Sequence, residues 1–140
     1  MSEPFTHPID VRYLEIDQQG VVFNMWYLAY FDDAMTAFLE HGGVRYEDMT
    51  AAGYDVQLVH AEMDWRGGVG WRDEVRVAVS LARRGGTSFT LDFQVLRNGD
   101  AVVDGRVVYV VIAADGSGKT AIPPSLSEAL GDERPLRPLP

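Results

Sequence analysis

One acidic residue stands where a turn meets the start of an amphipathic segment, a position suited to chemistry at a carbonyl carbon. Asp17 opens the turn Asp17-Gln18-Gln19-Gly20. A carboxylate placed there can attack a carbonyl to form an anhydride, or it can activate a water molecule. The first N–H groups of a helix lack partners within the helix, so amides of residues 20–24 could stabilise charge on the carbonyl oxygen. A carbonyl compound with an acidic leaving group suits such a site, because that group departs without a dedicated acid.

The same residues also have a structural interpretation. Acidic side chains are common near helix starts, where Asp17 would merely close a turn or cap the helix. Asn24 is as well explained as an N-cap as by contact with a substrate. If relatives use a histidine there, asparagine keeps a hydrogen bond but cannot titrate. Asp17 taken alone therefore leaves both interpretations open.

The segment after the turn predicts one long helix. Asn24 is its expected N-cap, and Gly42-Gly43 its expected end. A shorter helix is expected over residues 45–52. The apolar residues of the long helix recur at helical spacing and form one broad stripe: Tyr27, Tyr30, Phe31, Ala34, Met35, Phe38 and Leu39.

Alternating residues predict strands before and after these helices. They are expected at about residues 7–16, 56–65, 75–81, 89–95 and 107–112, with a hairpin turn at Asn98-Gly99-Asp100. This order favours a single α+β domain over residues 1–140, with an antiparallel meander and a loose tail at residues 131–140. Because one helix cannot cover both faces of such a sheet, we expect a homodimer or a homotetramer.

The composition excludes several kinds of partner and site. The 140 residues carry a formal net charge of −9, which repels nucleic acid and anionic membrane surfaces. The chain has no cysteine, and its three histidines show no metal-ligand spacing. It also has no secretory signal and no apolar run long enough to span a bilayer. We therefore expect a cytoplasmic protein that binds no nucleic acid, membrane or metal.

The stretch VRYLEIDQQGVVFNMWYLAYFDDA resembles the acid-turn-helix signature of the 4-hydroxybenzoyl-CoA thioesterase branch of the hotdog superfamily. There, an Asp is followed after two residues by Gly, then by apolar residues, a polar residue and a Tyr on the helix. The matching positions here are Asp17, Gly20, Val21, Val22, Phe23, Asn24 and Tyr27. The similarity continues through HAEMDW, RDEVRVAVSLARRGGTSFTLDFQVL and GKTAIPPSL, and so covers about His7 to Leu130.

The resemblance implies a hotdog fold, in which an antiparallel sheet wraps around one long central helix. It also implies hydrolysis of an acyl-CoA thioester, with Asp17 as nucleophile or general base and Tyr27 lining the acyl cleft. Coenzyme A is then part of the substrate, and no separate cofactor is needed. A turn between two strands suits its nucleotide, since arginines, hydroxyls and free backbone amides bind phosphate. The residues of this turn are Arg83, Arg84, Thr87 and Ser88; a solvated surface turn is the structural alternative.

Two other functions fit the same pattern. A non-hydrolytic acyl-thioester binding protein or accessory subunit would use Asp17 only to shape the turn. A hotdog dehydratase would need a histidine beside the acid, which Asn24 disfavours and His60 leaves open. The acyl group is open, and the negative charge of the chain favours free CoA over an acidic carrier protein.

Overall fold

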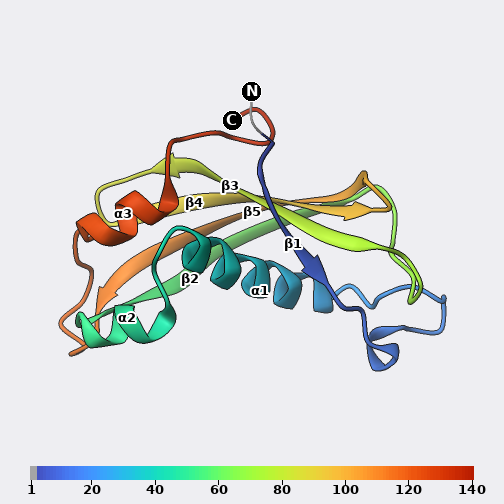
Figure 1. Cartoon of the computed structure of the whole chain (residues 1–140), viewed down its shortest axis with the longest axis horizontal. Helices are drawn as coiled ribbons and strands as arrows, with labels where there is room; N and C mark the ends of the chain where they lie inside the picture. Colours follow the sequence, from blue (N-terminus) through green and yellow to red (C-terminus); the bar gives the residue numbers. More distant parts are fainter. Residues whose placement is uncertain (1–2) are drawn as a thin grey trace.

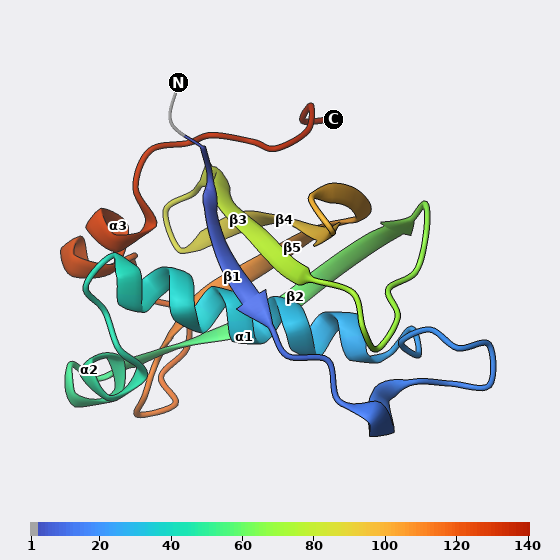
Figure 2. The same cartoon turned by 45° about the vertical axis from the view of Figure 1, so that its right-hand side comes forward.

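One antiparallel sheet and one long helix make up most of the structure. The computed structural model describes residues 3–140. Its elements are β1 (Phe5–Ile9), the 3-10 helix η1 (Tyr13–Glu15), α1 (Trp26–His41), α2 (Tyr46–Ala51), β2 (Tyr54–Trp65), β3 (Val75–Arg84), β4 (Ser88–Arg97), β5 (Asp100–Ala113) and α3 (Pro124–Leu130). The strands lie in the order β1-β3-β4-β5-β2, and α1 crosses one face of the sheet (Figure 1, Figure 2). This arrangement is the predicted hotdog fold.

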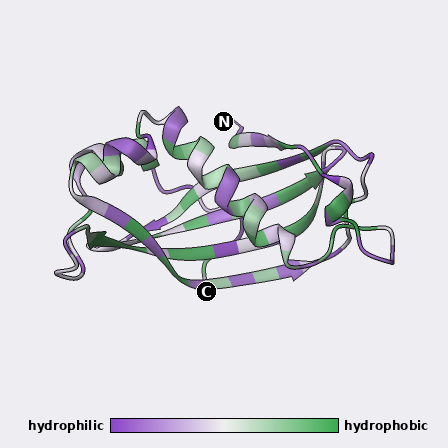
Figure 3. Ribbon diagram, turned by 90° about the horizontal axis from the view of Figure 1, so that it is seen from below, coloured by the Kyte–Doolittle hydropathy of each residue, from purple (hydrophilic) through white to green (hydrophobic). Residues whose placement is uncertain are grey.

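The core lies between α1 and the facing side of the sheet. The predicted apolar stripe is confirmed, with only Phe38 partly exposed. Alternate residues of the strands face it, so green and purple segments alternate along the ribbons (Figure 3). Phe31 of α1 stacks on Phe93 of β4 with ring centroids 4.6 Å apart. Opposite this pair stands Gly105, where an added methyl would lie only 2.6 Å from Phe31 Cζ, so the close approach of α1 requires glycine here.

The strand predicted over residues 7–16 is wrong beyond Ile9. After Ile9 the chain leaves the sheet and forms η1, because the Glu15 carboxylate accepts the backbone N–H of Arg12 at 3.0 Å and closes the turn. Val11 and Glu15 are buried, which produces an alternating pattern without a strand. The predicted meander is also incorrect, since β2 pairs with β5 rather than with β3.

The C-terminal region has more structure than the sequence predicts. Pro123-Pro124 ends the sheet region as expected, but Pro124 then occupies the first turn of α3, where its missing N–H costs nothing. Residues 131–140 are not a loose tail: Ser80 Oγ donates to the carbonyl of Arg134, and the Leu136 N–H donates to Asp92 Oδ2 at 2.9 Å. The tail therefore covers part of the sheet face that α1 leaves open.

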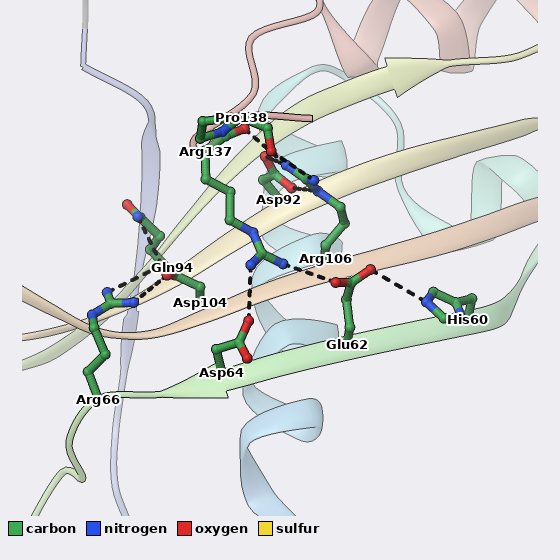
Figure 4. A network of polar contacts seen from close by, with 10 residues as sticks. All are labelled: His60, Glu62, Asp64, Arg66, Asp92, Gln94, Asp104, Arg106, Arg137 and Pro138. Carbon is green, nitrogen blue, oxygen red and sulfur yellow. Dashed lines mark hydrogen bonds and ion pairs between the residues drawn. The ribbon is translucent and has the colours of Figure 1, made fainter. Parts of the chain in front are cut away.

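A buried ion pair anchors this tail. Arg106 of β5 contacts both carboxylate oxygens of Asp92 at 2.6 and 3.0 Å, and the two side chains are 8% and 1% exposed. Arg106 also donates to the carbonyls of Arg137 and Pro138, while the Arg137 side chain reaches Glu62 and Asp64 on β2 (Figure 4). The Arg106–Asp92 pair joins β5 to β4, and the contacts of Arg106 and Arg137 link the tail to the sheet.

The sheet has two edge strands, β1 and β2. β1 has five residues, whereas β2 has twelve. Leu58 and Val59, at an irregularity in the middle of β2, are 39% and 54% exposed. β2 is therefore the long, partly apolar edge at which another strand could pair. No helix within residues 3–140 is both long and apolar enough to cross a membrane.

Candidate functional site

Asp17 lies in a small hairpin outside the main sheet. Its N–H donates to the carbonyl of Val21 at 2.8 Å, and the Phe23 N–H donates to the carbonyl of Glu15 at 2.9 Å. Gly20 donates to the Asp17 carbonyl and has φ +81°, the left-handed position that a three-residue hairpin turn requires. Asp17 Oδ1 accepts the N–H of Gln19 at 2.8 Å. The predicted turn is confirmed, and it holds one oxygen of the carboxylate.

This hairpin, the start of α1 and the segment after β2 surround a cavity of about 700 Å³. The predicted residues in its wall are Asp17, Val21, Val22, Phe23, Asn24 and Tyr27, joined by Gln18 and Gln19. Gly20 is not in the wall and serves the turn instead. Sequence reasoning missed Trp65, Gly67 and Gly68, which complete the wall. Their only signal was a glycine-rich bend directly after a predicted strand.

The backbone donors near Asp17 differ from the prediction. α1 begins at Trp26 with Met25 before it and no side-chain cap, so the N-cap predicted at Asn24 is wrong. The amides of Gly20, Val22 and Phe23 donate to the carbonyls of Asp17, Val69 and Glu15, so these three are not free donors. The amides of Gly20 and Phe23 close the hairpin itself, and the amide of Val22 joins it to the segment after β2. Within residues 3–140, the amides of Val21 and Asn24 are the cavity-wall donors of residues 20–24 without an acceptor.

Tyr27 combines an apolar ring with a buried hydroxyl. The residue is 1% exposed, its ring meets Trp65 edge-on at 5.9 Å, and its hydroxyl accepts the N–H of Val69 at 3.4 Å. Burial raises the pKa of Tyr27; the Val69 N–H and the charge of Arg97 oppose this, whereas the charge of Asp17 adds to it. The hydroxyl therefore keeps its proton at neutral pH and remains a hydrogen-bond donor.

The residues predicted to bind the nucleotide of CoA lie far from this cavity. Arg97, at the end of β4, donates to the Gly68 carbonyl in the cavity wall, and Arg97 pairs with Val75 at the beginning of β3. The turn that joins β3 to β4 is at the other end of both strands, roughly 30 Å away at 3.3 Å per residue. Thr87 and Ser88 in this turn therefore cannot share a ligand with Asp17 unless the ligand spans that distance or a second subunit contributes.

Arg84 makes structural contacts at the turn where the sequence predicts a CoA ligand. Its guanidinium donates to the carbonyls of Ser127, at 2.8 Å, and Gly131, while its backbone N–H donates to Glu133. These bonds fasten α3 and the tail to the hairpin; the two guanidinium bonds both come from Nη2, while Nε is buried without a partner within residues 3–140. Arg83 is exposed and has no ion pair in the described part of the chain, so it is the available arginine of this turn.

The dehydratase alternative needs a histidine beside Asp17, and His60 of the same chain does not lie there. His60 lies on the sheet face opposite α1, 3.5 Å from Glu62, which is bonded to the tail (Figure 4). The Asp17 cavity is on the α1 side, next to Tyr27. The sheet thus separates the two residues. Nor do any three histidine, aspartate or glutamate side chains of residues 3–140 gather as a metal site would require.

Comparison with known proteins places the chain in a family. A model of the thioesterase-like superfamily matches residues 11–130. A curated relative from Aquifex aeolicus (strain VF5), named as an esterase of unproven activity, is 28% identical over 130 residues, which are 92% of this chain and 99% of the relative.

Solved structures show the same fold. A 1,4-dihydroxy-2-naphthoyl-CoA thioesterase from Synechocystis superimposes with a TM-score of 0.83 at 20% identity, over 93% of this chain and 97% of that one. A Staphylococcus aureus protein solved in complex with CoA gives a TM-score of 0.86 at 17% identity, over 99% and 90% of the two chains. These identities establish the fold alone. Together with the family match, they show that the chain belongs to the thioesterase-like superfamily and has the hotdog fold.

Proposed function

We propose that the protein hydrolyses an acyl-CoA thioester, with Asp17 as the reacting carboxylate. The observation that carries this proposal is the position of Asp17 in the wall of a cavity of about 700 Å³, beside backbone donors without acceptors. Cavities of about 300–1,000 Å³ are typical of small-molecule sites. Membership of the thioesterase-like superfamily supports thioester hydrolysis, and the CoA bound to a protein of the same fold supports CoA as the leaving group.

The geometry suits either form of carboxylate catalysis. Gln19 holds Asp17 Oδ1, and Oδ2 has no partner within residues 3–140. Oδ2 can form a bond to the thioester carbon and expel the CoA thiolate, after which water cleaves the anhydride and restores the carboxylate. Alternatively, it can take a proton from a water molecule that attacks the same carbon. In both cases the amides of Val21 and Asn24 would receive the carbonyl oxygen, an interaction commonly worth about 3 kcal/mol.

The acyl group would lie against the apolar part of the cavity wall. Phe23, Tyr27 and Trp65 supply aromatic surface there. The Tyr27 hydroxyl, which keeps its proton, could donate to a polar atom of the substrate. These residues favour an apolar or aromatic acyl group and leave the nucleotide of CoA outside the cavity.

A homodimer formed through β2, with a homotetramer as a pair of such dimers, is the second part of the proposal. β2 offers a twelve-residue free edge with half-exposed Leu58 and Val59, and it ends at Trp65 in the cavity wall. Pairing of two β2 edges would place a partner subunit directly beside the cavity. Because Arg83 is far from Asp17 of its own chain, a CoA that does not span that distance would contact Arg83 of another subunit.

Release of free thiol from a panel of acyl thioesters tests the proposal. The panel contains short, long and aromatic acyl-CoAs and one carrier-protein thioester. The difference in tryptophan fluorescence between the wild type and Trp65→Phe reports binding in the same cavity. We expect catalytic thiol release from at least one acyl-CoA. Binding of acyl-CoA without thiol release from any member would refute hydrolysis and favour the non-hydrolytic binding protein.

A further inference from the structure

Glu15 is a buried acidic residue that the proposed chemistry does not use. It is 4% exposed and precedes Asp17 by two residues. Its Oε1 accepts the Tyr30 hydroxyl at 2.6 Å and the Arg12 N–H at 3.0 Å, and its Oε2 accepts Arg12 Nε at 3.0 Å. Burial alone would raise the pKa of Glu15, but the hydrogen bonds from Tyr30 and Arg12 and the charge of Arg12 outweigh it and hold the pKa below 4.5. Glu15 is therefore a fully bonded carboxylate at neutral pH.

Tyr30 supplies the link from this carboxylate to α1. It belongs to the buried stripe of the helix and meets Tyr27, one turn earlier, edge-on at 5.9 Å. Burial and the hydrogen bond to Glu15 both raise the pKa of Tyr30, so its hydroxyl stays protonated. An O–H donor at 2.6 Å from a carboxylate is a charge-assisted hydrogen bond, stronger than one between neutral groups.

The two strands of the Asp17 hairpin are thus tied to α1 through two tyrosines. The first strand is held directly, from Glu15 to Tyr30. The second is held through the segment after β2, since the Val22 N–H donates to the Val69 carbonyl at 2.9 Å and the Val69 N–H donates to the Tyr27 hydroxyl. The hydrogen bond between Glu15 and Tyr30, at 2.6 Å, is shorter than the one between Val69 and Tyr27, at 3.4 Å.

Apolar packing holds the hairpin through Val22, a core residue, and Ile16, which packs against the core, whereas the contact of Glu15 with α1 is polar. A second hollow, of about 530 Å³, lies between β1, η1 and α1, and both Glu15 and Tyr30 are in its wall. The walls of this hollow and of the Asp17 cavity have no residue in common. At this hollow the Glu15–Tyr30 bond is the direct polar link between the first strand of the hairpin and α1.

We propose that Glu15 and Tyr30 are positioning residues that set the place of Asp17 against the start of α1. The inference rests on the proposed function and concerns two residues outside the wall of the Asp17 cavity. Asp17 follows Glu15 by two residues, so a displacement of Glu15 also displaces Asp17. The Phe23 N–H donates to the Glu15 carbonyl, and this bond transmits the displacement to the neighbouring Asn24. Misplacement of a reacting group by about 1 Å can cost roughly a hundredfold in rate.

The test compares Tyr30→Phe with a matched control. Tyr109→Phe makes the same change at another buried tyrosine, on β5, whose hydroxyl has no hydrogen bond within the described residues. For Tyr30→Phe we expect kcat to fall by roughly tenfold or more at an unchanged KM. Amide hydrogen exchange at Asp17 and Phe23, which bond across the hairpin, should accelerate by about the same factor. The control should leave both readouts within about twofold of wild type.

Glu15→Gln refines the test, because its amide oxygen still accepts the Tyr30 hydroxyl while the charge is lost. Its decrease in kcat should be smaller than that of Tyr30→Phe. The proposal is overturned if Tyr30→Phe has the kcat of the control, even if exchange accelerates. If wild-type protein releases no thiol from any acyl-CoA, the proposed function fails separately. In that case amide hydrogen exchange alone tests the positioning role. Unchanged protection of the Asp17 and Phe23 amides in Tyr30→Phe would overturn it.

Discussion

Gly105→Ala should disrupt the packing of α1 on the sheet. The new methyl would lie 2.6 Å from Phe31 Cζ and 3.2 Å from Phe31 Cδ2. Carbon atoms in van der Waals contact are about 3.5–4.0 Å apart, so the ring must move by about 1 Å. Phe31 is 0% exposed and stacks on Phe93 with an interplanar angle of 12°, so it has no open space to enter.

The size of the effect follows from this confinement. Overpacking of a close-packed core by one carbon costs about 1–3 kcal/mol, and the upper part of that range applies where the neighbour is a buried aromatic ring. We therefore expect the free energy of unfolding to fall by about 2–3 kcal/mol. The movement of α1 that relieves the overlap should also displace the Asp17 hairpin and lower thiol release.

Urea titration at a fixed temperature measures the loss, with Gly86→Ala as control. Nothing lies within 4 Å of a methyl at Gly86, and its φ is not in the left-handed region, so this variant should stay within about 0.5 kcal/mol of wild type. Phe31→Leu should destabilise the wild type but restore part of the stability of Gly105→Ala, because it removes the overlapping atoms. A loss below about 0.5 kcal/mol for Gly105→Ala would refute the packing argument.

Three further predictions concern charged side chains. Arg106→Leu leaves Asp92 as an unpaired buried charge and should lower the free energy of unfolding by about 3–5 kcal/mol in urea; a loss below about 1 kcal/mol would contradict the role of the pair. Folding lowers the pKa of Glu15, so its ionisation stabilises the protein above pH 4.5 and this contribution is lost as pH falls through the folded pKa. The difference in stability between wild type and Glu15→Gln should therefore shrink between about pH 7 and about pH 3, and a constant difference would refute the assignment. Arg84→Met should lower the melting temperature without changing KM for acyl-CoA, whereas Arg83→Met should raise KM; the opposite pattern would restore Arg84 as a CoA ligand.

The sequence predicted those parts of the fold that local chemistry determines. The stripe from Tyr27 to Leu39 predicted α1, since a helical repeat of apolar residues has one burial solution. Asn98-Gly99 predicted the β4–β5 hairpin, and both residues do adopt positive φ, at 51° and 91°. The turn from Asp17 to Gly20 follows the same logic. In each of these segments the conformational preference of the backbone is determined by residues close together in the sequence.

Features that depend on distant partners escaped prediction. The tail is fixed by Arg106 and Asp92, and nothing in residues 131–140 signals that a buried ion pair will bind their backbone. The structural contacts of Arg84 also escaped prediction, because the carbonyls of Ser127 and Gly131 that accept its hydrogen bonds lie more than forty positions later. The prediction missed Trp65 in the candidate site for a similar reason, because its position depends on the pairing of β2 with β5.

The carboxylate of Asp17 is the centre of the account, and Asp17→Asn tests it most directly. Asparagine keeps an oxygen that can accept the Gln19 N–H, so the turn survives while the nucleophilic or basic oxygen is lost. Asp115→Asn is the matched control: Asp115 Oδ1 accepts the Ser117 N–H at the same 2.8 Å, beyond the far end of β5 from Trp65. We predict that kcat for acyl-CoA hydrolysis falls at least about a hundredfold in Asp17→Asn, with the melting temperature and the control variant unchanged. Near-normal turnover by a folded Asp17→Asn protein would contradict the account and reduce Asp17 to a residue that closes a turn.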